Sequence, residues 1–107
     1  MRLKAAVGAA LALLMQWGGP EKILWSTGCT VVHPQHLLKL FWAFQFSEET
    51  LSRHGIPQID EGVKRMILGG NYARLAGLDI ADWQARQKGD AFDCVELKEP
   101  WSCWQSL

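Results

Sequence analysis

Three residues that commonly bind zinc lie close together in this sequence. Cys29, His33 and His36 form the pattern C-x3-H-x2-H, and thiolate and imidazole are both good zinc ligands. However, the spacing matches no standard zinc finger, Pro34 separates the two histidines, and a fourth ligand would have to come from His54 or from a distant acid. The simpler interpretation is a core cysteine followed by two ordinary histidines at the start of a helix, so we predict no metal site here.

The other polar residues that could do chemistry have simpler structural explanations. Ser26 and Ser47 lack the sequence context of a nucleophile elbow. Gly69–Gly70–Asn71 lacks the Lys-Ser/Thr and the preceding strand of a phosphate-binding loop, and a helix stop followed by a helix N-cap explains it better. Asp79 and Asp82 form an acid pair at helical spacing, which capping explains. We therefore predict no catalytic, cofactor-binding or metal-binding residue in this chain.

The composition limits both the size of the protein and its partners. The sequence has 107 residues, with 11 basic and 11 acidic side chains and zero formal net charge, so it accommodates one small domain. A neutral chain is poorly suited to nucleic acid or anionic lipid, and we expect neither nucleic acid nor a membrane as a partner. Three widely spaced cysteines without a CxxC pair favour a reducing compartment, and hence a cytoplasmic protein. Six tryptophans are a heavy aromatic load, so some rings should lie at the surface or against a partner.

The N-terminus has two interpretations that the residues alone leave open. Met1–Lys4 is basic and Ala5–Met15 is apolar, as in a secretory signal, which would make the protein secreted with residues Met1–Trp17 removed. The apolar run lacks a small-x-small cleavage site and is too short to span a bilayer, which takes about 20 residues. The alternative is a buried helix that ends at Gly18–Gly19. Its apolar residues recur at helical spacing: Leu3, Val7, Leu11 and Leu14.

One segment, Lys22–Thr27, predicts a β-strand. Its residues Ile23, Leu24 and Trp25 are consecutive and apolar, as in a parallel strand that is buried on both faces. Such a strand needs neighbouring strands to pair its N–H and C=O groups, and the sequence contains no clear partner for it. We therefore expect that another chain supplies the missing strands, or that the chain forms a homodimer. A small helical protein in which Ile23–Trp25 packs as an extended loop is the alternative fold.

The rest of the chain is expected to be helical. The capping and breaking residues predict helices over Pro34–Phe46, after Ser47, over Glu61–Leu68 after Asp60, over Tyr72–Ala76 after Asn71, and from Asp79 to near Gly89. The expected fold class is thus an α/β fragment, mostly helical, with one buried strand flanked by helices. Residues 1–87 would form this unit, and residues 88–107 an irregular tail.

Four segments follow one another in an order that is typical of a known family. They are GPEKILWST at Gly19–Thr27, PQ at Pro34–Gln35, FQFSEE at Phe44–Glu49 and KRMILGGNYARLAGLD at Lys64–Asp79. In this order they resemble the C-terminal end of the amidohydrolase-related (amidohydrolase 2) family of metal-dependent hydrolases and decarboxylases. Members of this family are TIM barrels whose last strand typically has the sequence G-x-D/E-R/K-I-L-W-G-T-D, and whose chain closes with K-x-K-I-L-G-G-N-A-A-R-L-Y-G-L-D. The resemblance covers most of the chain, and it would correspond to the last βα unit and C-terminal helices of a barrel of about 250 residues.

The resemblance implies an enzyme segment without its active site. In the family, an aspartate at the end of this strand helps to bind the metal, usually zinc, and the matching residue here is Gly28, which has no side chain to bind it. The family's histidine ligands lie on earlier strands and match neither His33 nor His36. The family also has a helix of small and apolar residues before this strand, which favours the helix interpretation of Ala5–Trp17.

The function implied is that of the C-terminal portion of a metal-dependent hydrolase or decarboxylase, inactive as this isolated chain. Substrates of the family are small carboxylated or amide-like molecules. The alternative function is a small non-catalytic helical interaction module that dimerises or binds a partner protein.

Overall fold

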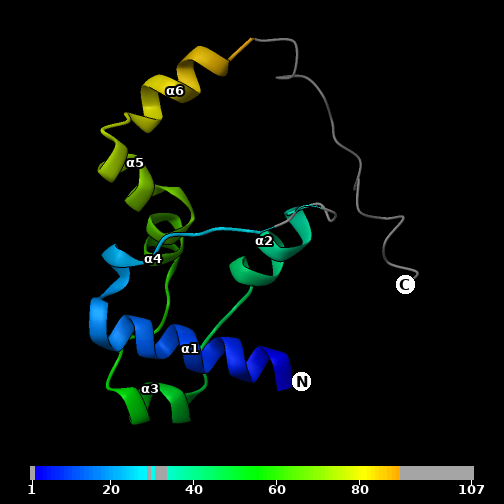
Figure 1. Cartoon of the computed structure of the whole chain (residues 1–107), viewed down its shortest axis with the longest axis vertical. Helices are drawn as coiled ribbons and strands as arrows, with labels where there is room; N and C mark the ends of the chain where they lie inside the picture. Colours follow the sequence, from blue (N-terminus) through cyan, green and yellow to red (C-terminus); the bar gives the residue numbers. More distant parts are fainter. Residues whose placement is uncertain (1, 29, 31–33, 90–107) are drawn as a thin grey trace, which may run out of the picture.

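The structure is a computed structural model, and it describes residues 2–28, 30 and 34–89. Two candidate zinc ligands, Cys29 and His33, and nearly all of the predicted tail at 88–107 lie outside these residues. The described elements, shown in Figure 1, are α1 (Arg2–Gly18), the 3-10 turn η1 (Pro20–Lys22), α2 (Gln35–Trp42), α3 (Glu48–His54), α4 (Glu61–Arg65), the π-helical turn η2 (Met66–Gly70), α5 (Asn71–Ala76) and α6 (Ile80–Gln87).

The described residues contain no β-strand, so the prediction of an α/β fragment with one buried strand flanked by helices is wrong. Residues 23–28 have no helical or strand assignment and form no ladder with a neighbouring segment. The Trp25 N–H donates to the Ile67 carbonyl over 3.0 Å, and Leu24 is 46% exposed. A strand is defined by the backbone pairs that it makes with a neighbour. Without such a neighbour, the three apolar residues pack as a loop, as in the alternative fold above.

A helix is present at the N-terminus, but of Val7, Leu11 and Leu14, which were predicted to face inward, only Leu11 packs against the core. Val7 and Leu14 are each 56% exposed. The side that faces the rest of the molecule is made instead by small and apolar residues: Gly8, Leu11, Ala12 and Met15. Because nearly every residue of α1 is apolar, helical spacing alone does not decide which side packs inward. The helix ends before Gly19, whose left-handed φ of 76° suits glycine.

The predicted N-caps of three helices are confirmed. The side chains of Ser47, Asp60 and Asp79 each accept a hydrogen bond from the backbone N–H three residues later, at 3.2, 2.8 and 3.1 Å. These bonds satisfy N–H groups that have no partner inside the first helical turn. Capping therefore accounts for the acid pair formed by Asp79 and Asp82.

The predicted helix stop at Gly69–Gly70 is wrong. The chain continues from α4 through η2 directly into α5, and Gly70 and Asn71 both have right-handed helical backbone angles. Glycine weakens a helix but does not forbid it, so packing decides whether the helix continues. Asn71 is consequently not an N-cap, and its side chain is free to bind elsewhere.

A small hydrophobic core connects α1 with the later helices. Its buried residues are Ala12, Met15, Phe46, Ile59 and Ile67, and Trp25, Phe41 and Phe44 pack against them. α1 lies beside α3, and α5 and α6 lead away from these two helices (Figure 1). Residues 80–89 are all exposed, so α6 adds nothing to the core.

Candidate functional site

The described part of the chain has no group of three or more His, Cys, Asp or Glu side chains that could hold a metal ion. His36 is exposed on α2. His54 lies on α3, where its Nδ1 atom is 2.9 Å from Oε1 of Gln16. Gly28, which matches the family's metal-binding aspartate, is exposed and has a φ of 56°. The two candidate ligands that are described thus lie on separate helices, and one of them is already bonded to an amide.

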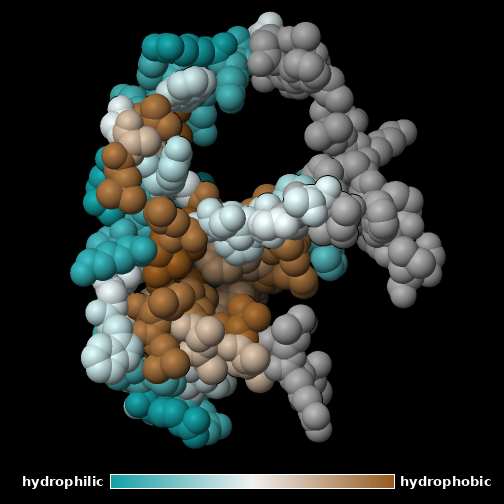
Figure 2. Space-filling view, viewed as in Figure 1, coloured by the Kyte–Doolittle hydropathy of each residue, from teal (hydrophilic) through white to brown (hydrophobic). Residues whose placement is uncertain are grey.

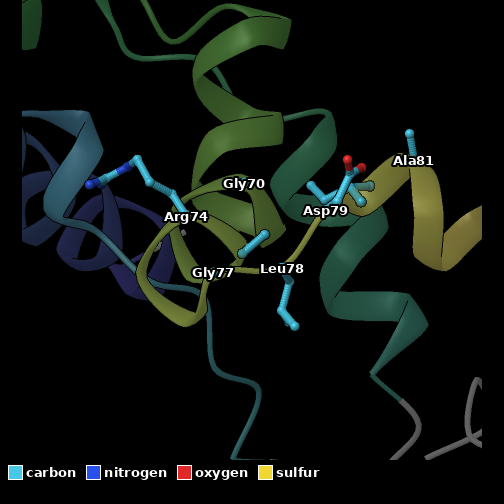
Figure 3. A pocket seen from close by; sticks show the side chains of 8 residues that line it. Gly70, Arg74, Gly77, Leu78, Asp79 and Ala81 are labelled. Carbon is cyan, nitrogen blue, oxygen red and sulfur yellow. The ribbon is translucent and has the colours of Figure 1, made fainter.

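A shallow hollow lies between α5 and the start of α6 (Figure 3). Its two charged side chains already have structural partners: Arg74 donates to the Glu21 carbonyl, and Asp79 accepts the N–H of Asp82. Figure 3 shows Arg74 and Asp79 on opposite sides of the hollow. Its lining residues are Gly70, Ala73, Arg74, Gly77, Leu78, Asp79, Ile80 and Ala81. A catalytic pocket needs polar groups that converge on one point, and this hollow does not provide them.

One of the two buried polar residues in the described part of the chain is Asn71, at the start of α5. It is 1% exposed, and its Nδ2 atom donates to the carbonyls of Pro20 at 2.8 Å and Ile23 at 2.9 Å. An amide nitrogen carries two hydrogens, so both are used. Because an unpaired buried amide is costly, these bonds fix the position of the turn η1 against α5.

Two further bonds, from η2 and α5, hold the same segment. The Arg74 guanidinium donates to the Glu21 carbonyl at 2.8 Å, and the Ile67 carbonyl accepts from the Trp25 N–H at 3.0 Å. Ile67 lies in η2 and contributes its backbone carbonyl, whereas Asn71 and Arg74 lie in α5 and contribute side chains. We call these three residues the clamp. The clamp was not predicted, because Asn71 has the residue type of a helix cap and its partners lie about 50 residues earlier.

A second buried polar group is Lys64 on α4, which is 3% exposed. Its Nζ atom donates to the Trp42 carbonyl at 2.6 Å and lies 5.9 Å from the centre of the Trp42 ring. Arg65 lies over the same ring at 5.3 Å. Within the described residues, Lys64 makes no ion pair. Through this bond Lys64 attaches α2 to α4.

Comparisons of the chain with protein-family models, with curated proteins and with solved structures find no match. Among the described helices, none combines the length and the apolar character needed to cross a membrane.

Proposed function

We propose that this chain is the C-terminal portion of an amidohydrolase-related metal-dependent hydrolase or decarboxylase, and that it is inactive by itself. The observation that carries the proposal is the clamp. It joins Gly19–Thr27 to Lys64–Asp79, which are the two longest segments of the resemblance. Four hydrogen bonds link them although they lie roughly 50 residues apart. Residues that are shared with a family for structural reasons are expected to contact one another in this way.

The lack of activity follows from what metal-assisted hydrolysis requires. A metal that lowers the pKa of water or polarises a substrate must be held by several convergent ligands. Gly28 stands where the family has its aspartate, and the family's histidine ligands match no residue of this sequence. Divalent metal, usually zinc in the family, would therefore have to be held by residues outside this chain.

The partner we propose is a further stretch of polypeptide that covers the loop at residues 23–27. Leu24 and Ser26 are exposed and make no hydrogen bond within the described part of the chain. The Trp25 ring is held against Phe41, with 4.9 Å between ring centres. Its Nε1 hydrogen is buried and has no acceptor among the described residues. The exposure of Leu24 and Ser26, without hydrogen bonds among the described residues, is what supports a missing neighbour at this loop.

Two experiments test the proposal. The purified 107-residue chain with added zinc should give no turnover of aromatic carboxylic acids or small esters above the rate with zinc alone. Clear metal-dependent turnover would overturn the claim of inactivity.

The second experiment measures the intact mass of the native product, captured from its source cells with an antibody against Lys64–Asp79. A mass well above 12.0 kDa, or a co-captured chain that carries barrel strands with histidine ligands, supports the family proposal. A monomer of 12.0 kDa without any such chain would contradict it.

A further inference from the structure

We propose that α6 pairs in antiparallel orientation with α6 of a second copy of the chain, with Trp83 of each copy at the centre of the pair. On one flank, Asp79 of each copy meets Arg86 of the other. α6 begins at Ile80, after the last segment of the resemblance, so this pairing goes beyond the proposed function and does not depend on the enzyme family.

α6 is a short helix that nothing in the described part of the chain covers. It has eight residues, and residues 80–89 are all exposed. Figure 2 shows the brown, strongly apolar residues gathered over α1 and the middle of the molecule, whereas α6 at the top is mostly teal and pale. Helices of this length are marginal in water and normally depend on the packing of one face. Among the described residues, α6 lacks the neighbour that would supply this packing.

Two large apolar side chains mark the face of α6 that would pack. Ile80 and Trp83 are 46% and 49% exposed, and their spacing of three residues makes them neighbours on the helix surface. Gln87 follows four residues after Trp83, which completes the spacing of the contact positions in a helix pair. Figure 1 shows α6 at the end of the described chain, away from α1 and α3, which leaves this face open to a second copy.

The charges of α6 favour a second copy in antiparallel orientation. Asp79 caps the N-terminus of the helix and Asp82 lies in its first turn, whereas Arg86 lies in the last turn and Lys88 follows as the C-cap. The acids are thus at one end and the bases at the other. In an antiparallel pair the acidic start of each helix lies beside the basic end of the other. A parallel pair would place acid beside acid and base beside base, and such charges decide the orientation of paired helices.

A register centred on Trp83 brings these charges together. Asp79 and Arg86 are seven residues apart, so they lie on the same flank of the helix, next to Trp83. When Trp83 of both copies lies at one level, Asp79 lies at the level of Gln87 of the other copy, about 1.5 Å along the axis from Arg86. The two-fold symmetry of the pair makes this contact twice. The two copies of Asp79 remain about 12 Å apart along the axis.

The same register also joins the apolar residues. With Trp83 opposite Trp83 of the other copy, Ile80 lies at the level of Arg86 of that copy, between its Trp83 and its Gln87. Each isoleucine therefore contacts the edge of the other copy's indole ring and the aliphatic part of its glutamine. The centre of the pair is apolar, and the ion pairs lie on one flank.

Both charged groups have the capacity for this contact. Asp79 accepts the Asp82 N–H through its Oδ1 atom at 3.1 Å and makes no ion pair within the described part of the chain, so its Oδ2 atom remains to accept a bond. Arg86 is 2.7 Å from Oδ2 of Asp82, and a guanidinium has five N–H donors. Arg74 does not compete for Asp79, because it donates to the Glu21 carbonyl on the opposite side of the hollow (Figure 3).

The interface is small, because it consists of one tryptophan pair, two isoleucines and two exposed ion pairs. Interfaces below the standard size are weak, and we expect a dissociation constant of about 50–500 μM. At the micromolar concentrations of an unfolding experiment the chain should then be monomeric. Pairing would therefore leave the free energy of unfolding of the dilute chain unchanged.

The test is sedimentation equilibrium of the full chain from about 5 to about 1000 μM. We expect a concentration-dependent dimer. Trp83→Ala should weaken it at least ~10-fold, because both central rings are lost. The control Trp17→Ala makes the same change at a tryptophan that is 83% exposed on α1, and it should leave dimerisation unchanged. Circular dichroism of both variants should keep the helical signal, since neither ring belongs to the core.

Orientation is tested with Arg86→Gln, using Arg53→Gln as the control. The two arginines are matched, because each lies in the last turn of its helix and pairs with an acid four residues earlier, at 2.7 and 2.8 Å. Arg86→Gln should weaken the dimer about three- to tenfold at low salt, whereas Arg53→Gln should not. A dimer that Arg86→Gln leaves unchanged or strengthens would overturn the antiparallel arrangement. A chain that stays monomeric throughout, a dimer insensitive to Trp83→Ala, or one that Trp17→Ala weakens equally would overturn the proposal.

Discussion

The side-chain amide of Asn71 lies 2.9 Å from the carbonyl oxygen of Ile23, 48 residues earlier in the chain. This bond connects the start of α5 to the loop that follows α1. Since Asn71 is 1% exposed, water does not compete for its hydrogens. The contact therefore connects the two halves of the described chain. Its loss should lower the free energy of unfolding of the whole fold.

Asn71→Ala should lower the free energy of unfolding by about 2–4 kcal/mol, because the Pro20 and Ile23 carbonyls both lose their donor. Urea denaturation followed by circular dichroism measures this change. The neighbouring substitution Tyr72→Ala is the control: Tyr72 is 61% exposed and should cost no more than about 0.5 kcal/mol. Equal effects of the two substitutions would show that the clamp does not stabilise the fold.

Two substitutions of Lys64 separate its charge from its hydrophobic stem. Lys64→Met keeps the stem but removes an ammonium group that is buried without an ion pair among the described residues, so the free energy of unfolding should change by no more than about 1 kcal/mol. Lys64→Ala also removes the packed stem and should cost about 2–4 kcal/mol. Denaturant unfolding of both variants checks the difference. If Lys64→Met were as destabilising as Lys64→Ala, the bond to the Trp42 carbonyl would matter more than the burial of the stem.

The N-caps of α4 and α6 are chemically alike but should differ in their effect on stability. Asp60→Ala should lower the global free energy of unfolding by about 1 kcal/mol, because α4 belongs to the packed part of the fold. Asp79→Ala should leave the global value unchanged and increase amide exchange in α6 alone, because residues 80–89 are all exposed. Hydrogen exchange and urea titration together distinguish the two. A global loss in Asp79→Ala would mean that α6 packs against something in solution.

The features that were predicted correctly are those decided by neighbouring residues. Ser47, Asp60 and Asp79 cap helices through bonds that span three residues, so residue type and position are sufficient to identify them. The N-terminal helix agrees with the local preference of alanine and leucine, although the residues alone left a secretory signal open and only the family resemblance favoured the helix. Which side of that helix packs inward depends on distant residues, and the prediction was wrong for Val7 and Leu14 but right for Leu11.

The features that were missed depend on distant partners. Whether Ile23–Trp25 becomes a strand depends on a neighbouring strand, and the described chain supplies a single carbonyl, from Ile67. Asn71 has the residue type of a helix cap, and nothing near it in the sequence indicates that its partners precede it by about 50 residues. Lysine is rarely buried, so the residue type predicts an exposed side chain at position 64, whereas Lys64 is buried.

Two glycines provide a matched test of the continuous path from α4 to α5. At Gly69 and Gly77 an added Cβ atom would meet nothing within 4 Å, so packing does not distinguish them. Gly77 has a left-handed φ of 65°, whereas Gly69 lies inside the helical turn η2 and is not among the residues with positive φ. Gly69→Ala should therefore raise the free energy of unfolding by about 0.5–1 kcal/mol through the smaller entropy of the unfolded chain. Gly77→Ala should lower it by about 1 kcal/mol, because alanine is strained in the left-handed region. Thermal and urea unfolding of the two variants measure whether each change raises or lowers the free energy of unfolding. If Gly69→Ala were destabilising, η2 would not be helical in solution and the helix would stop there.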